Sequence, residues 1–410
     1  MPSSTIRIFL FRPLRLLPVL LVAACSPSGP DSDSPFMGTQ AEKEDAAPVL
    51  QVAAVLNETD FQIRFRFETD NPVWYHQYWV YRDGDWVRYG SGAEGPDEHG
   101  LYEDRISVMW DDGSVLGFAE RGGFVAAHPG MRSTSGAAPA EEVRDHPHLG
   151  ETLGRSDVRK FILESREADA PPAEAWRHVR PADELESLRE EGVFLDLWQW
   201  RAHRSHPLGY ADNGYVLEYR HSSSGRSMYA TNQDSDTGLP RYMFDPEQTG
   251  FRALDFDKLV ERAYGQDDLY YLAENSAAPF DPDHDWSDGD AIPHRILRQP
   301  EGSRGAIRAS GGHQNGAWRI RLTRSLEAPD PLDSKDFIPG EIIHAAFAVH
   351  AGGTGARHHW VSHPVSIGMD TDGDIVATRV DGDLDEVELD YTAVPLFIPP
   401  DIADAPVSID

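Results

Sequence analysis

Histidine is the residue type of this chain whose placement most directly suggests chemistry. His128 closes a turn of small and apolar residues that begins at Gly122, and Met131 follows three residues later. An imidazole nitrogen and a thioether sulfur are both ligands that haem iron accepts. A second group gathers near the end of the chain, at His350, His358, His359 and His363. Neutral imidazole is the commonest metal ligand, so this group permits a metal site, although scattered surface histidines would give the same pattern.

A third candidate is the segment from Asp196 to Ser205, which concentrates aromatic and cationic side chains. Its members are Trp198, Trp200, Arg201, His203 and Arg204. Trp198 and Trp200 are two residues apart and therefore share one face of a strand. Such a cluster can line a large flat ligand, with the guanidinium groups on the carboxylates of that ligand. A core strand with internally paired arginines is the alternative.

Signatures of hydrolases and calcium sites are absent or incomplete. The chain contains no G-x-S-x-G, no H-E-x-x-H and no glycine-rich phosphate loop with lysine. Residues 370–374 resemble the start of a calcium loop, but Asp381 stands where the twelfth position requires glutamate. A solvated acidic turn is the better interpretation. A hydrolase with a metal site at His350, His358 and His359 is a weak hypothesis, because no general base is recognisable.

Charge and cysteine content restrict the partners and cofactors. The 410 residues include 69 Asp and Glu against 37 Lys and Arg, which gives a formal net charge of −32. A surface this acidic repels phosphate backbones and argues against nucleic acid as a partner. Cys25 is the only cysteine. One thiol excludes an internal disulfide, a zinc–thiolate site, a cysteine-ligated iron–sulfur cluster and covalent c-type haem.

The N-terminus has the pattern of an export signal. Three arginines precede or open the apolar run from Leu16 to Ala24, which is too short to span a bilayer. Small residues stand just before Cys25, as in the cleavage box of bacterial lipoproteins, in which the cysteine becomes the lipidated N-terminus. An ordinary secretory signal with a chance cysteine is the alternative.

Three consequences follow for the N-terminal region. We expect residues 1–24 to be a lipoprotein signal peptide and residues 25–46, rich in Pro, Ser, Gly and Asp, to be a flexible tether. The mature chain would then be held by its lipid on the periplasmic side of a bacterial membrane. Ser26 after the cysteine favours the outer membrane, since aspartate there signals inner-membrane retention.

Alternation of apolar and polar residues predicts strands towards both ends of the chain. Residues 61–67 and 318–322 alternate with period two, and residues 342–350 and 360–367 form apolar strands. Between the two ends lies a loop-rich middle, residues 119–310, with few helical patterns. The predicted fold is mainly β, an immunoglobulin-like β-sandwich with long loop-rich insertions and a few short helices. Neither end alone can cover its apolar face, so both ends should share one sandwich.

Several motifs, taken in order, resemble one family. They are Tyr102–Arg105, Gly122–His128, Asp196–Ser205, Pro207–Asp212, Gly302–Gly305, Phe347–His350 and Arg357–Ser362. This series is similar to the haem-binding domain family of the ethylbenzene dehydrogenase γ subunit, grouped with cytochrome c-552 and dimethyl sulfoxide reductase-type enzymes. The resemblance covers about residues 47–380 and leaves residues 381–410 as an acidic C-terminal extension. It implies a β-sandwich that holds one haem between or beside its sheets.

The chain departs from the cysteine motif of some relatives. Those relatives carry Cys-x-x-x-Cys-His, whereas this chain has Gly123 and Ala127 ahead of His128. The resemblance therefore implies haem b, bound without a covalent link, although loss of haem would also fit. The axial pair in the ethylbenzene enzyme is methionine and lysine. This chain has four lysines, and only Lys335 stands near the later motifs.

The resemblance also implies the axial ligands of the haem iron. His128 would supply one axial nitrogen. His359 is the preferred second ligand, because it stands in the family's Arg-x-His-x-Val-Ser pattern, which begins at Arg357. The reserves are Met131, His203 and His350.

The remaining roles concern the macrocycle. Arg201 and Arg204 would pair with the haem propionates, and Trp198 and Trp200 would pack on the ring. The predicted protein is an exported, lipid-anchored b-type haem protein for single-electron transfer, not itself a catalyst. It would act alone or as a γ-like subunit of a molybdoenzyme, whose molybdopterin and iron–sulfur subunits would be its redox partners. The alternative is a carbohydrate- or ligand-binding sandwich without haem, which would present its tryptophans to sugar rings.

Overall fold

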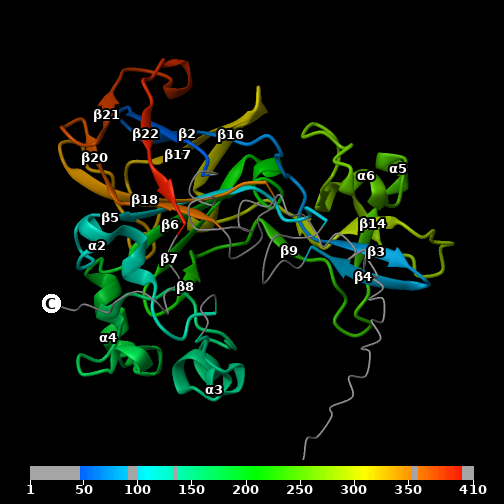
Figure 1. The fold of residues 1–410 in the computed structure, drawn as a ribbon, viewed down its shortest axis with the longest axis horizontal. Coiled ribbons are helices and arrows are strands. Elements are labelled where there is room, and N and C mark those ends of the chain that lie inside the picture. Colours follow the sequence, from blue (N-terminus) through cyan, green and yellow to red (C-terminus); the bar gives the residue numbers. More distant parts are fainter. Residues whose placement is uncertain (1–46, 91–98, 133–135, 353–358, 399–410) are drawn as a thin grey trace, which may run out of the picture. The chain divides into compact units, whose positions relative to one another are not determined.

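The computed structural model describes residues 47–90, 99–132, 136–352 and 359–398, which form a mainly β fold with short helices (Figure 1). The predicted fold class is confirmed. All of these residues fall within one compact unit, residues 33–410. The expected signal peptide, Cys25 and the tether lie outside the described residues, as do Arg357 and His358. No helix in the described ranges is both long and apolar enough to cross a bilayer.

The main sheet closes on itself. Its order is β20-β21-β1-β2-β17-β16-β7-β6-β5-β18, and β18 also pairs with β20. The bounds of these strands are β1 Leu50–Leu56, β2 Asp60–Glu68, β5 Arg105–Asp111, β6 Leu195–Arg201, β7 Tyr210–Val216, β16 Ile307–Gln314, β17 Ala317–Ser325, β18 Ile342–His350, β20 Val365–Met369 and β21 Ile375–Arg379. The two layers expected of a sandwich are therefore joined by hydrogen-bonded strands at both edges.

Short strands extend the closed sheet, here called the ring. They are β8 (Arg220–Ser222), which pairs with β7, β19 (Trp360–Ser362), which pairs with β18, β22 (Thr392–Val394), which pairs with β1, and β23 (Leu396–Phe397), which pairs with β19. The acidic segment from residue 381 onwards thus contributes two strands to the sheet, besides the short helix η8 (Leu384–Glu386).

The core of the protein fills the inside of the ring. Alternate residues of β2 point inward and are fully buried, as the period-two pattern of residues 61–67 predicts. The largest inward side chains are Trp110, Trp198, Trp200 and Trp318. β1 lies between β2 and the late strand β21, in parallel to the latter. The expectation that the first and last strands share one structure is confirmed.

Two insertions into the sheet combine into a second lobe, here called the insertion lobe. It contains β3 (Tyr78–Arg82), β4 (Asp85–Tyr89), β9 (Tyr229–Thr231), β10 (Tyr242–Phe244), β11 (Leu254–Asp255), β12 (Leu272–Ala273), β13 (Ala277–Pro279), β14 (Asp290–Pro293), β15 (Arg295–Leu297), α5 (Pro246–Thr249), α6 (Phe256–Val260) and η6 (Glu274–Ser276). These elements form three small sheets around a separate apolar core. Trp74 packs against both this core and the core of the ring.

A third region, here called the helical insertion, connects β5 to β6 and packs on the outside of the ring. It contains α2 (Phe118–Arg121), η1 (Gly122–Ala126), α3 (Ala140–Arg144), η2 (Pro147–Thr152), η3 (Leu163–Ser165), η4 (Pro172–Arg177) and α4 (Ala182–Glu190). Val125 and Ala126 of η1 share an apolar cluster with Met109 of β5 and Ala346 of β18. Two further turns, η5 (His206–Leu208) and η7 (Ser303–Gly305), flank β7 and β16.

The position of Trp198 inside the ring gives a first test. We expect Trp198→Ala to lower the free energy of unfolding by about 3–5 kcal/mol, because it leaves a cavity in a packed core. Urea unfolding followed by circular dichroism measures this change. Tyr391→Ala is the control, because Tyr391 is 41% exposed and such a change costs less than about 0.5 kcal/mol. Equal losses in both variants would contradict the described core.

Candidate functional site

His128 lies just after η1, is partly buried, and stands near the charges of Arg166 and Lys160. Its ring stacks on Phe161 with the centroids 4.3 Å apart. Burial lowers the pKa of His128 to about 4, although hydrogen bonds to the carbonyl groups of Val125 and Phe161 oppose this effect. The imidazole is therefore neutral at pH 7. Its Nε2 is buried and has no hydrogen-bond partner among the described residues. If Nδ1 makes the carbonyl contacts, the lone pair lies on Nε2, as a metal ligand requires.

Met131 lies on the same turn as His128. The peptide N–H of His128 points at Met131 Sδ, 3.2 Å away. Gly130 makes this turn with a φ of 85°, and a Cβ there would lie 2.4 Å from Cδ1 of Trp176. Only glycine meets both demands. The structure brings the two predicted ligands together, but two axial ligands must lie on opposite faces of one iron, so adjacency alone does not make them a pair.

Lys160 is a neighbour of His128 that sequence reasoning missed. Burial, together with a smaller effect of the nearby Arg220, lowers the pKa of Lys160 to about 8. The charge of Lys160 in turn contributes to the lowered pKa of His128. Nothing in the local sequence signals this, because the effect arises from side chains that are distant along the chain.

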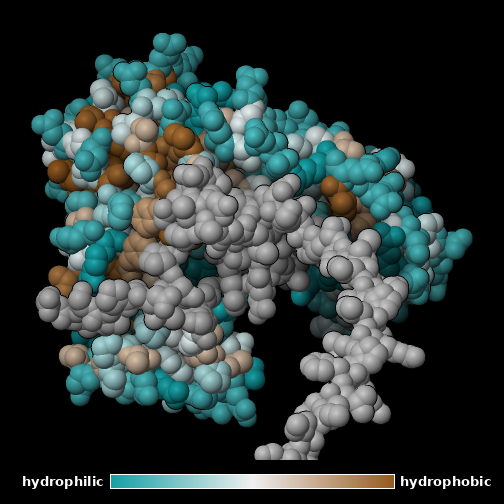
Figure 2. Space-filling model, viewed as in Figure 1, coloured by the Kyte–Doolittle hydropathy of each residue, from teal (hydrophilic) through white to brown (hydrophobic). Residues whose placement is uncertain are grey.

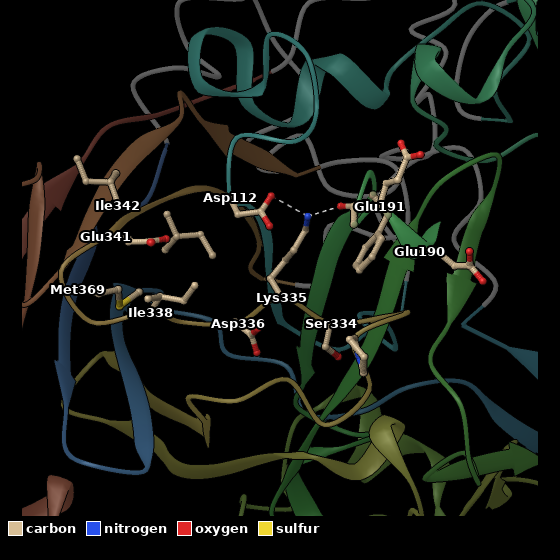
Figure 3. Close-up of a pocket in the computed structure, with 14 residues that line it drawn as sticks. Asp112, Glu190, Glu191, Ser334, Lys335, Asp336, Ile338, Glu341, Ile342 and Met369 are labelled. Carbon is tan, nitrogen blue, oxygen red and sulfur yellow. Dashed lines mark hydrogen bonds and ion pairs between the residues drawn. The ribbon is translucent and has the colours of Figure 1, made fainter. Parts of the chain in front are cut away.

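Lys335, the lysine considered from sequence, lies elsewhere. It lines a cavity of about 360 Å³ that contains no histidine in its wall (Figure 3). Its Nζ donates to Asp112 Oδ1 and Ser114 Oγ, both at 2.8 Å, and to the carbonyl oxygen of Gly192. An ammonium group has three donors, and all three are used here. The arrangement holds Lys335 as a structural cation.

His350 and His359 meet across the hairpin of β18 and β19. Their rings stack with centroids 4.7 Å apart and an interplanar angle of 17°. His363 packs instead on Phe397, at 4.5 Å. Nowhere in the described ranges do three or more His, Cys, Asp or Glu side chains gather as a metal ion would require. His358, the remaining member of the predicted zinc hypothesis, lies outside those ranges.

His203 is fully buried where the ring meets the insertion lobe. Its Nδ1 lies 3.2 Å from the carbonyl oxygen of Trp74, and its Nε2 is buried without a partner among the described residues. Burial lowers the pKa of His203 to about 4, against the opposing charge of Glu103. The rings of Tyr78 and Tyr270 pack on it, with centroids 5.9 and 5.8 Å away.

Arg201 and Arg204 are paired with buried carboxylates. Arg201 Nη1 donates to Asp212 Oδ2 at 2.7 Å, and Arg304 Nε donates to the other oxygen of Asp212 at 2.8 Å. Arg204 Nε donates to Glu103, which also accepts the peptide N–H groups of His203 and Arg204 at 2.6 and 2.8 Å. The two motifs Tyr102–Arg105 and Asp196–Ser205 are thus joined, which sequence reasoning did not foresee.

Trp198 and Trp200 point to the opposite face of β6 from Arg201. Both are fully buried inside the ring. Trp198 packs on Trp110 with centroids 5.2 Å apart, and Trp200 packs on Trp318 at 5.0 Å. In this arrangement they belong to the apolar core of the ring, with the guanidinium of Arg324 5.1 Å from the Trp198 ring centroid, and they support β6 from within.

The histidines border one positively charged region. The positive charge of Arg201 lowers the pKa of Arg220, and the charge of Arg220 lowers the pKa of Lys160. The charge of Lys160 in turn lowers the pKa of His128. On the other side, the strand register places His350 opposite Arg105, and Arg105 opposite Arg201. Arginines therefore connect the surroundings of His128 with those of His203 and His350.

Comparison with known proteins places the chain in a family. A model of the ethylbenzene dehydrogenase family matches residues 21–362. This chain belongs to the ethylbenzene dehydrogenase family. The resemblance of the ordered motifs is confirmed. A stretch of 92 residues is also 28% identical to cytochrome c-552 of Stutzerimonas stutzeri, and it covers 22% of this chain and 30% of that relative. The chain therefore spans less than a third of that relative's length.

The buried histidines of this family member predict a pH dependence. His203 has a pKa of about 4 in the folded state and about 6.5 when unfolded, so stability is lost as the pH falls from 6.5 towards 4. His203→Gln removes this titration. Between pH 7 and pH 5 we expect the free energy of unfolding of the haem-free wild type to fall by about 2 kcal/mol more than that of the variant. Urea titrations at both pH values measure this, and parallel losses would contradict the buried neutral imidazole.

Proposed function

We propose that this protein is a haem protein that transfers single electrons and binds haem b without a covalent link. Three findings support the proposal: membership of the ethylbenzene dehydrogenase family, the similarity to a protein named cytochrome c-552, and the state of His128. The third carries it. A neutral imidazole whose Nε2 is buried and has no hydrogen-bond partner among the described residues has lost its hydration without compensation from them, and an iron ligand bond would provide that compensation.

The residues around His128 fit such a cofactor. His128 would hold the iron through Nε2, and haem would supply the one-electron couple. The chain's own contribution is to fix the imidazole through the Val125 and Phe161 carbonyls, to keep water away, and to set the potential through the second ligand. We retain His359 as the proposed second ligand. Met131, His203, His350 and Lys160 are the other candidates.

The cellular setting is also part of the proposal. We infer from residues 1–25 that the protein is exported and lipid-anchored at Cys25 on the periplasmic side of a bacterial membrane, with the outer membrane favoured. Membership of a dehydrogenase family supports redox partner subunits, and the molybdopterin and iron–sulfur subunits of a molybdoenzyme are the proposed partners. The protein would relay electrons and not carry out the substrate chemistry.

The carbohydrate-binding alternative receives little support from the tryptophans. All ten lie in the described ranges. Eight of them are buried, and the remaining two, Trp74 and Trp86, are partly buried. A sugar-binding groove would need tryptophan faces open to solvent.

Haem reconstitution tests the proposed function. The mature chain expressed with haem supply should show a Soret band, with split α and β bands on reduction. His128→Ala should convert a six-coordinate low-spin haem to a five-coordinate or empty state, because one axial bond is lost. His284→Ala, in the insertion lobe, is the matched control and should keep the wild-type spectrum. An unchanged low-spin spectrum in His128→Ala would remove His128 from the ligand pair, and no Soret band in the wild type would overturn the function.

A change at the N-terminus tests the proposed anchor. Cys25→Ala should leave the precursor without lipid, so the protein should move from the membrane fraction to the soluble fraction or remain uncleaved. The lipid is the expected source of membrane affinity, because a chain with a net charge of −32 gains nothing from an anionic surface. Fractionation followed by immunoblotting measures the change. Unchanged membrane association of the variant would mean that another anchor exists.

A further inference from the structure

Guanidinium groups converge on Tyr229 from different parts of the chain. The guanidinium carbons of Arg201, Arg204 and Arg295 lie 5.8, 5.3 and 6.0 Å from the centroid of its ring. Arg201 ends β6 of the ring, whereas Tyr229 and Arg295 stand on the paired strands β9 and β15 of the insertion lobe. Together with two neighbours they form what we call the arginine cluster: Arg105, Arg201, Arg204, Arg295 and Arg304.

The arginine cluster holds more positive than negative charge. Among the described residues, its five guanidinium groups have two buried carboxylates as partners. Asp212 is shared by Arg201 and Arg304, and Glu103 by Arg204 and Arg105. Arg295 donates instead to two neutral oxygens, Oγ1 of Thr231 at 2.6 Å and Oε1 of Gln77 at 3.2 Å. This surplus is notable in a chain with a net charge of −32, because buried charge without a counter-ion is costly.

Several N–H groups of the arginine cluster have no hydrogen-bond acceptor in the described part of the chain. Arg105 is 8% exposed, with its guanidinium 4.2 Å from the ring centroid of Tyr102. Its Nη2 is buried and lacks a hydrogen-bond partner among the described residues, as do Nε of Arg201 and Nε of Arg295, while Nε of Arg105 has only the ion pair with Glu103 at 3.7 Å. The positive charge of the cluster also changes the pKa of the Tyr229 phenol. Burial alone would raise the pKa of its phenol, but Arg201 and Arg204 hold that pKa below its usual value.

We propose that the arginine cluster is a binding site for a doubly charged oxyanion, either a pair of carboxylates or a phosphate. Such a group offers several acceptor oxygens in the planar geometry that guanidinium donors match, and its charge offsets the surplus. The same chemistry could come from the two propionates of haem or from a free dianion. The proposal that haem propionates occupy the site rests on the proposed function. Binding of a free dianion does not, because the charges and the unpartnered donors exist without haem.

The first experiment uses the haem-free full chain and inorganic phosphate. Calorimetric titration at constant ionic strength, with chloride as the reference anion, should show saturable phosphate binding. Arg295→Gln should weaken it about tenfold, because a charge-assisted hydrogen bond is lost. Arg295 is partly exposed, so this change leaves the core of the fold intact. Arg308→Gln is the matched control, since Arg308 is exposed and pairs with Asp60 away from the cluster.

The second experiment separates the two sources by comparing haem with haem dimethyl ester, which lacks the two charges. If propionates are the ligand, the wild type should bind the ester about tenfold more weakly than it binds haem. The Arg295→Gln variant should bind the ester and haem equally well. Phosphate binding with no preference between haem and its ester would identify a free dianion. Phosphate binding without any haem binding would overturn the proposed function but support this site. If Arg295→Gln weakens the binding of phosphate and of haem no more than Arg308→Gln does, the site is overturned.

Discussion

The carboxylate of Glu103 is buried at the point where the ring meets the insertion lobe, and it lies close to residues of both. It accepts two peptide N–H groups from the turn after β6 and the guanidinium of Arg204, while Arg105 and His76 lie 3.7 and 3.6 Å from it. Burial alone would raise its pKa, but Arg204 and Arg105 lower that pKa to about 2. A charge so deeply buried requires all of these partners in place. The entry to β5, the exit from β6 and the position of His203 therefore depend on one side chain.

Around this centre, the two faces of β6 are divided between stability and chemistry. Trp198 and Trp200 fill the inside of the ring, and Arg201 lies on the outside, opposite Arg105. The inner face supplies a rigid base, because tryptophans packed on other aromatic rings have little freedom to move. The outer face can then carry closely spaced cations at fixed positions. The helical insertion adds His128 to the same side of β5, through the contact of η1 with Met109 and Ala346.

The sequence predicted some of these features and could not predict others. The alternation of residues 61–67 revealed β2, because a strand with one buried face has a period of two. The spacing of Trp198 and Trp200 placed them on one face, but periodicity does not tell which face turns inward. The pairing of Arg201 with Asp212 and of Arg204 with Glu103 depends on strand register. The sequence did not indicate Lys160 as a site residue, because its lowered pKa comes from neighbours that only the fold brings close. The site residues deduced from motif positions remain proposals.

The closed sheet also determines when the chain can fold. β2 cannot complete its pairing before β17 is present, and the first residue of β17 lies 249 positions after the last residue of β2. β1 likewise cannot complete its pairing before β21 is present. Until the last quarter of the chain is present, β2 lacks its hydrogen-bonding partner at one edge, and β1 lacks β21. Contacts this distant along the chain make folding slow, since loop closure must precede the gain from pairing. Once β18 pairs with β20, each strand of the ring has a partner on both sides in the described part of the chain, which reduces the edges to which other chains could add. The same closure that delays folding thus protects the finished sheet.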